Sequence, residues 1–74
     1  MNVKRMNDVG LLEARVCERI WGQVSDLRLY MVNGGVLLRG RAPTYYVKQL
    51  AQHAALEASQ LPLAANEIEV AYPG

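Results

Sequence analysis

The chain contains few side chains of the kind that catalyse reactions or hold metals. Among its 74 residues there is one histidine, His53, and one cysteine, Cys17. A nucleophilic or metal site needs several groups that converge at hydrogen-bond or coordination distance, and neither residue has a companion at a suitable spacing. His53 lies four residues before Glu57, which favours a solvated pair on a helix flank. The sequence therefore predicts no catalytic residues, no cofactor and no metal site.

Three arginines could instead bind an anion. Arg28, Arg39 and Arg41 fall on one face of a predicted hairpin, around Tyr30, because alternate residues of a strand point to the same side. Guanidinium groups recognise phosphates, so lipid head groups or a nucleic-acid backbone are candidate ligands. These four residues form the predicted lipid or anion site.

Two observations limit this interpretation. Glu67 and Glu69 of a later strand are expected on the same face, where cross-strand pairs would neutralise the arginines. A sheet that binds RNA would show two or three interleaved aromatic side chains, whereas only Tyr30 is available here. The sequence therefore disfavours nucleic acid as a partner and leaves a paired, solvated face as the alternative to a lipid site.

A second set of side chains could contact another protein or a second copy of the chain. Tyr45 and Leu56 are expected on the outer side of one helix, and Trp21 at the border of another. Val32 and Leu37 are expected on the uncovered sheet face. If Val32 and Leu37 join Tyr30 across this face, a patch results that a protein partner, a homodimer or a membrane interface could cover.

The elements that would position these residues begin with a hairpin over Leu27–Arg41. Asn33-Gly34 suits a two-residue type I′ turn, in which both central residues need a positive φ. This turn sets Met31 opposite Val36 and Leu29 opposite Leu38. The face predicted to join the core contains Leu27, Leu29, Met31, Val36 and Leu38. Since the Gly-rich turn belongs to a hairpin and no helix starts directly after it, it does not indicate a phosphate-binding loop.

Two helices and a third strand complete the predicted order. Asn7 or Asp8 can cap a first helix that runs to about Val24, and Thr44 can cap a second from about Tyr45 to Ser59. Alternation from Asn66 to Tyr72 predicts the strand. The expected fold is therefore α+β, an α-β-β-α-β two-layer sandwich with two helices on one face of a three-stranded mixed sheet. Residues 7–74 would form the domain, and residues 1–6 a disordered tail.

Composition fits an ordinary globular domain and narrows the choice of partner. Hydrophobic residues make up 51% of the chain and charged residues 20%, with a net charge of +1. Basic residues concentrate before position 42, but the excess is far below that of a dedicated nucleic-acid binder. No apolar run approaches the roughly 20 residues of a spanning helix, and the first ten residues lack the apolar segment of a secretory signal. As written, the chain is expected in the cytoplasm, or peripheral to a membrane or envelope.

Three segments together form a family pattern. They are VNGGVLLRGRAP at 32–43, YYVKQLAQHAALEA at 45–58 and NEIEV at 66–70. The first segment contains the Asn-Gly turn and the Val-x-Leu-x-Gly strand, the second is an alanine-rich helix with Lys48, and the third is the closing Asn-x-Ile-x-Val. With these motifs the chain resembles the BON domain, the bacterial osmotically-inducible and nodulation module, over roughly residues 9–70. Many relatives carry a glycine-valine pair before the last strand, where this chain has Leu61-Pro62-Leu63-Ala64-Ala65.

The resemblance implies an α-β-β-α-β sandwich without catalytic residues. It also implies binding to phospholipid or other surfaces of the bacterial envelope, often in osmotic or stress protection. The expected function is accordingly a non-enzymatic BON-like binding module for phospholipid or membrane surfaces. The alternative is a protein-protein interaction or self-assembly module that uses the uncovered sheet face.

Overall fold

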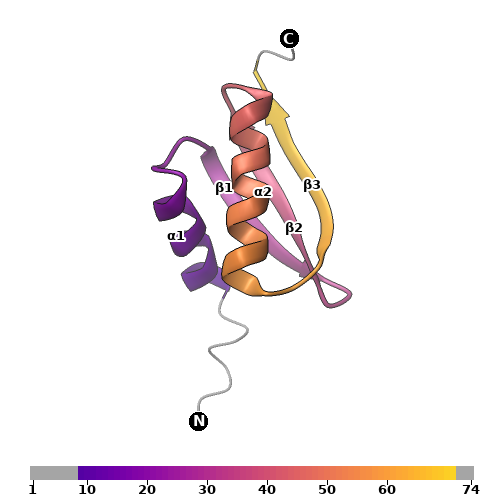
Figure 1. Ribbon diagram of the computed structural model, residues 1–74. Coiled ribbons are helices and arrows are strands. Elements are labelled where there is room, and N and C mark those ends of the chain that lie inside the picture. Colours follow the sequence, from indigo (N-terminus) through magenta and orange to yellow (C-terminus); the bar gives the residue numbers. More distant parts are fainter. Residues whose placement is uncertain (1–8, 72–74) are drawn as a thin grey trace.

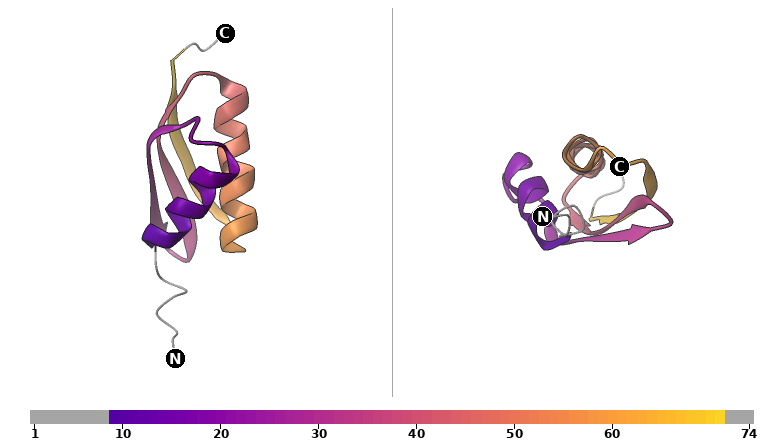
Figure 2. Two further views of the ribbon diagram at one scale, coloured as in Figure 1. Left: turned by 90° about the vertical axis from the view of Figure 1, so that its left-hand side faces the viewer. Right: turned by 90° about the horizontal axis from the view of Figure 1, so that it is seen from below.

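Two helices cover one face of a three-stranded sheet in the computed structural model, which describes residues 9–71 (Figure 1). The elements are α1 (Val9–Arg19), β1 (Ser25–Val32), β2 (Gly35–Ala42), α2 (Tyr45–Ser59) and β3 (Leu63–Val70). β2 is the central strand, antiparallel to β1 and parallel to β3. Figure 2 shows that α2 lies over the sheet and α1 lies towards its β1 side. The predicted α-β-β-α-β fold is confirmed, and no element within residues 9–71 covers the opposite sheet face.

The hairpin of β1 and β2 forms as the sequence predicts. Asn33 and Gly34 both have positive φ, 49° and 79°, as a type I′ turn requires. Met31 faces Val36 and Leu29 faces Leu38 in the observed register. The turn therefore directs alternate side chains of both strands to the same two faces as predicted.

The core lies between the sheet and the two helices. Of the predicted core face, Leu29, Val36 and Leu38 are buried and Leu27 is half-buried. Met31 was predicted in the core but is 37% exposed. It lies on an edge strand, one residue from the end of β1 at the turn, where fewer neighbours surround a side chain. The remaining buried side chains come from both helices, from the segment that follows α1, from the end of β2 and from β3: Val16, Ile20, Val24, Ala42, Val47, Ala51, Ala54, Ala55 and Ile68.

The first helix ends five residues before the predicted limit at Val24. The N–H of Trp21 donates to the main-chain oxygen of Glu18 (3.1 Å), and the N–H of Gly22 donates to the main-chain oxygen of Cys17 (2.9 Å). These two bonds are those of a Schellman closure, which places a residue of positive φ directly after the helix. Here that residue is Trp21, with φ of 59°. Hydrophobic spacing continued past this point, so the prediction followed the spacing and missed the closure.

The second helix has the predicted bounds, Tyr45–Ser59. The Oγ1 of Thr44 accepts a hydrogen bond from the N–H of Val47 at 3.2 Å, which confirms the predicted cap. Ala51 and Ala55 are fully buried. Such small side chains let the helix lie close to the sheet, and because α2 contacts β2, β3 and α1, this helix connects the two layers.

The third strand begins earlier than predicted, at Leu63 instead of Asn66. Val36 pairs with Leu63, and Leu37 pairs with Ala65, so Ala64 is an extra residue in the ladder. The N–H of Val36 also donates to the oxygen of Pro62 at 2.9 Å. These long-range bonds hold residues 63–65 in the sheet although their alternation is weak. The predicted strand end at Tyr72, the cap at Asn7 or Asp8 and the predicted tail 1–6 lie outside the described residues.

Asn66 connects β3 to α2. Its Nδ2 donates to the oxygen of Lys48 and to Oε1 of Gln52, both at 3.2 Å. Its Oδ1 accepts from the N–H of Ile68, also at 3.2 Å. One partly buried amide thus satisfies polar groups of the helix and of the strand itself.

We expect Asn66→Ala to lower the free energy of unfolding by about 1–3 kcal/mol, because it leaves partly buried polar groups of Lys48 and Ile68 without their partner. Urea denaturation measures this difference. Gln52→Ala is the matched control, since it removes only one of the three hydrogen bonds. An equal loss in the control would show that the bonds to the main chain contribute little.

Candidate functional site

The uncovered side of the sheet, called here the open sheet face, is the first candidate surface. It contains all four residues of the predicted anion site. A shallow hollow of about 600 Å³ lies on this face. Its lining combines basic and acidic side chains with one aromatic ring: Asp26, Arg28, Tyr30, Arg39, Gly40, Arg41, Glu67 and Glu69. The structure therefore brings the predicted anion-site residues together around one hollow.

Two of the three arginines are paired with β3 as the alternative interpretation predicted. Arg39 Nε lies 2.9 Å from Glu67 Oε1, and Arg41 Nε lies 3.9 Å from Glu69 Oε1. Both pairs join residues that are direct neighbours in the β2–β3 ladder. The Arg39 guanidinium also lies over the Tyr30 ring, 5.9 Å from its centroid. Arg39 is therefore held in place, whereas the longer contact leaves Arg41 loosely paired.

Arg28 has a partner that the sequence analysis did not identify. Its Nη1 lies 3.9 Å from Glu13 Oε1, while Glu13 Oε2 accepts the N–H of Leu29 at 3.0 Å. The side chain of Glu13 is only 21% exposed, and a carboxylate at that depth needs such partners. Glu13 lies within the apolar stripe of the first helix, and an acid at such a position was the sequence signal that could have revealed this contact. Because Arg28 sits directly opposite Arg39 in the hairpin, positive charge remains concentrated at this point.

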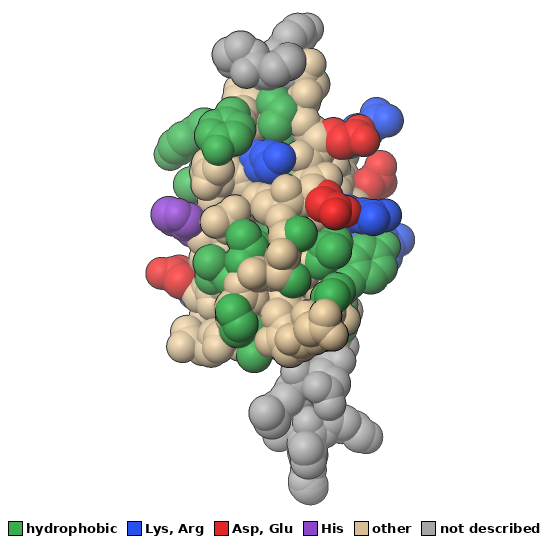
Figure 3. All heavy atoms as spheres, turned by 90° about the vertical axis from the view of Figure 1, so that its right-hand side faces the viewer, with side chains coloured by type: hydrophobic (Ala, Val, Ile, Leu, Met, Phe, Trp, Pro, Cys, Tyr) green, Lys and Arg blue, Asp and Glu red, His purple; other side chains and the backbone are tan. Residues whose placement is uncertain are grey.

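Acidic and basic side chains alternate along this part of the molecule. In Figure 3 red and blue spheres lie side by side near one margin, and hydrophobic side chains gather lower on the same view. The open sheet face is thus a mixed-charge surface and not a uniformly basic one. It can hold an anionic group only where an arginine exchanges a glutamate for that group.

The five residues predicted to contact a partner do not lie on one side of the sheet. Val32 and Leu37 are half-buried on the sheet. Trp21 and Tyr45 are exposed at the helices, and Leu56 is half-buried in α2. Sequence spacing placed each residue on an element but could not place the elements around one another. The five residues therefore belong to separate parts of the fold.

A second candidate surface lies where the C-terminal end of α1 meets α2. A groove of about 580 Å³ runs between them, and we call it the Trp21 groove. Its lining includes Trp21 and, from α2, Tyr46 and His53, which the sequence analysis did not assign to an interaction site. Trp21 is 86% exposed and Tyr46 is 70% exposed. Only the packing of α1 against α2 brings these aromatic residues together, so spacing along one helix could not reveal the groove.

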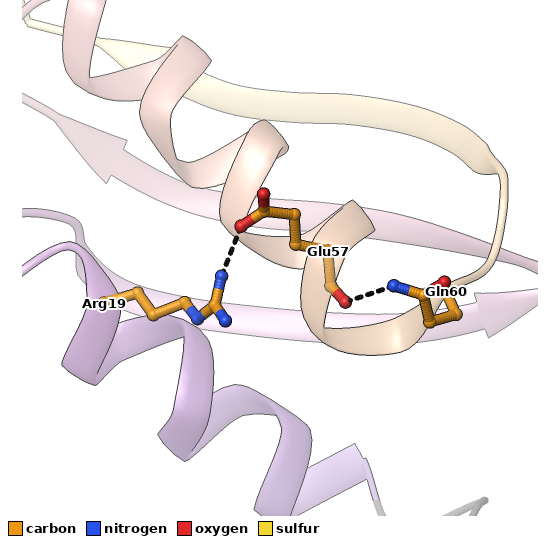
Figure 4. Close-up of polar contacts among 3 residues, drawn as sticks. All are labelled: Arg19, Glu57 and Gln60. Carbon is orange, nitrogen blue, oxygen red and sulfur yellow. Dashed lines mark hydrogen bonds and ion pairs between the residues drawn. The ribbon is translucent and has the colours of Figure 1, made fainter.

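An ion pair closes one side of this groove. The carboxylate of Glu57 in α2 pairs with Arg19 of α1. The main-chain oxygen of Glu57 accepts a hydrogen bond from Nε2 of Gln60 at 2.9 Å (Figure 4). The prediction that Glu57 pairs with His53 is wrong, because Arg19 reaches Glu57 from the neighbouring helix. This contact ties the two helices together beside the exposed aromatic residues.

Within residues 9–71, no group of three or more His, Cys, Asp or Glu side chains could hold a metal ion. No helix in the same range is long and apolar enough to cross a membrane. Comparisons with protein-family models, with curated proteins and with solved structures found no match.

Proposed function

We propose that the chain is a non-enzymatic, BON-like binding module that associates peripherally with anionic phospholipid surfaces through the open sheet face. The observation that carries this proposal is an uncovered sheet face on which, among residues 9–71, Arg28 and Arg41 have only long ionic contacts, each 3.9 Å. The resemblance of the sequence motifs to the BON domain supports the same function.

The long contacts matter because they leave the guanidinium groups hydrated and able to change partners. More than half of each side chain, Arg28 and Arg41, is exposed. A phosphate offers the same bidentate geometry as a carboxylate and carries a comparable charge. A lipid head group at the hollow can therefore replace the exposed Glu69 as the partner of Arg41. When Arg28 turns to a head group, Glu13 keeps its hydrogen bond from the N–H of Leu29.

The glutamates also set the strength of the interaction. Glu67 and Glu69 bring negative charge to the same face as the arginines, which opposes an anionic membrane. Exposed charge interactions are further screened over about 8–10 Å at physiological salt. Binding is accordingly expected to be weak, reversible and sensitive to ionic strength.

Co-sedimentation with vesicles tests this function. We expect vesicles that contain phosphatidylserine, but not vesicles of phosphatidylcholine alone, to pellet the protein at low salt. Arg28→Gln combined with Arg41→Gln should weaken this binding roughly 30-fold, because each basic residue near an anionic surface contributes about 1 kcal/mol. Failure to pellet with anionic vesicles at low salt would reject lipid binding.

Two further variants separate a specific face from net charge. Arg15→Gln with Lys48→Gln removes the same charge outside the hollow, and should weaken binding much less. Glu67→Gln with Glu69→Gln should strengthen binding, because it removes the acids that compete with the membrane. If the Arg28→Gln, Arg41→Gln double variant and the charge-matched control lose binding equally, the open sheet face is not the site.

A further inference from the structure

Trp21 combines an unfavourable backbone conformation with nearly full exposure. Its φ of 59° is in the left-handed region, which bulky side chains adopt at a cost in energy and which glycine or asparagine adopts readily. The two main-chain hydrogen bonds of the Schellman closure hold this backbone conformation, but because 86% of the residue is exposed, the indole gains little from contacts within the chain. Tryptophan and tyrosine are enriched at protein interfaces, so an exposed indole beside the exposed Tyr46 is suited to contact with a partner.

The surface beside Trp21 has the shape to receive such a side chain. The floor of the Trp21 groove includes Ile20 and Ala54, which are 2% and 7% exposed. Leu50 adds a half-buried apolar side chain, and Tyr46 forms an exposed aromatic wall. A projecting indole therefore lies next to a hollow that combines these apolar side chains with a polar rim. This self-complementarity is what a two-fold interface between identical chains requires.

We propose that a second copy of the chain docks at this surface, so that Trp21 of each copy lies in the Trp21 groove of the other. Arg19 and Glu57 at the rim supply one charge of each sign, which a two-fold axis can pair between copies as well as within one. The net charge of +1 creates little repulsion between two chains. Both shape and charge therefore fit a second copy.

The area that the exposed aromatic side chains can bury limits the strength of this dimer. An aromatic side chain buries about 150–250 Å², so Trp21 and Tyr46 of both copies together supply roughly 600–1,000 Å². Biological interfaces begin near 1,000 Å², and those at the lower limit are weak and transient. We therefore expect a dissociation constant of roughly 0.1–1 mM.

This dimer would leave the proposed lipid surface free. The Trp21 groove is lined by residues of α1, of α2 and of the segment after α1, and both helices lie on the side of the sheet opposite the open sheet face (Figure 2). Docking through the helices therefore directs the two open sheet faces outward. The inference goes beyond lipid binding and does not depend on it.

The single tryptophan makes the proposal directly measurable, because Trp21 is the only source of indole fluorescence. In a concentration series without lipid, we expect its emission to shift to shorter wavelength as the protein is concentrated. Sedimentation velocity should show a monomer–dimer equilibrium with the same midpoint. A monomer at 1 mM with unshifted emission would overturn the proposal, as would an emission shift that appears only when vesicles are added to dilute protein.

Adjacent tyrosines supply a matched pair of variants. Tyr46→Ser removes a wall of the groove and should weaken the dimer about tenfold or more. Tyr45→Ser removes the neighbouring exposed tyrosine, which does not line the groove, and should leave the equilibrium within about twofold. Equal weakening by both variants would place the interface elsewhere on α2.

Trp21→Asn tests the projecting residue itself. Asparagine tolerates positive φ, so this variant should keep its thermal midpoint while the dimer is lost. Retention of the dimer by the folded variant contradicts the proposal. Circular dichroism confirms that the compared variants share the same fold.

Discussion

Leu38→Ala is expected to lower the free energy of unfolding by about 2–5 kcal/mol. Leu38 lies on the central strand and has no exposed surface. Its removal leaves a cavity beneath α2, and the sheet on either side limits how far neighbouring side chains can move into it. Domains are stable by only about 5–15 kcal/mol, and one of this size lies near the lower limit. We therefore expect a large unfolded fraction under native conditions.

Urea denaturation followed by circular dichroism measures this loss. The matched control is Leu37→Ala, which removes the same atoms from the adjacent, half-buried residue on the open sheet face. Its expected cost is clearly smaller, because Leu37 is less completely buried than Leu38 and already has some contact with water. A larger loss for Leu37→Ala than for Leu38→Ala would mean that the assignment of the two sheet faces is inverted.

The elements that could be predicted from the sequence depend on local interactions. Asn33-Gly34 specifies a turn whose geometry then sets the register of β1 and β2. Thr44 follows Pro43 and caps α2, while the residues after Ser59 stop it. In each case the determining residues lie within a few positions of the feature, so the sequence contains the necessary information locally.

The features that were mispredicted depend on contacts between distant segments. β3 begins at Leu63 because Pro62 and the following residues pair with β2, about 26 positions earlier. Alternation within residues 63–65 is too weak to predict this. The end of α1 differs in kind: Gly22 was a local signal for helix termination, but the apolar spacing through Ile20 and Val24 outweighed it.

The candidate surfaces show the same division. Strand alternation predicted that the arginines and Glu67 share one face. The pairing of β2 with β3 then brings Arg39 into contact with Glu67. Glu13 and the Trp21 groove were missed, because both depend on how α1 packs against β1 and α2. Periodicity predicts which side of a helix is apolar, but it does not predict which residue of another element will lie opposite.

Gly40→Ala is expected to lower the free energy of unfolding by about 2–6 kcal/mol. Gly40 has a φ of 152°, where a side chain causes backbone strain of about 1–3 kcal/mol. A Cβ atom here would lie 2.8 Å from Cγ1 of Val24 and 2.9 Å from the main-chain oxygen of Ser25. Overpacking of this kind costs a further 1–3 kcal/mol or so. The start of β1 would therefore have to move away from the central strand.

Gly34→Ala provides the control that separates strain from close packing. Gly34 also has a positive φ, 79°, but nothing lies within 4 Å of a Cβ at this position. Its expected cost is about 1–2 kcal/mol, the strain of a left-handed residue alone. Hydrogen exchange should also show faster exchange in β1 for the Gly40 variant, because the clash falls on Val24 and Ser25 at its start. If both variants lose the same stability, close packing of β1 over Gly40 makes no contribution.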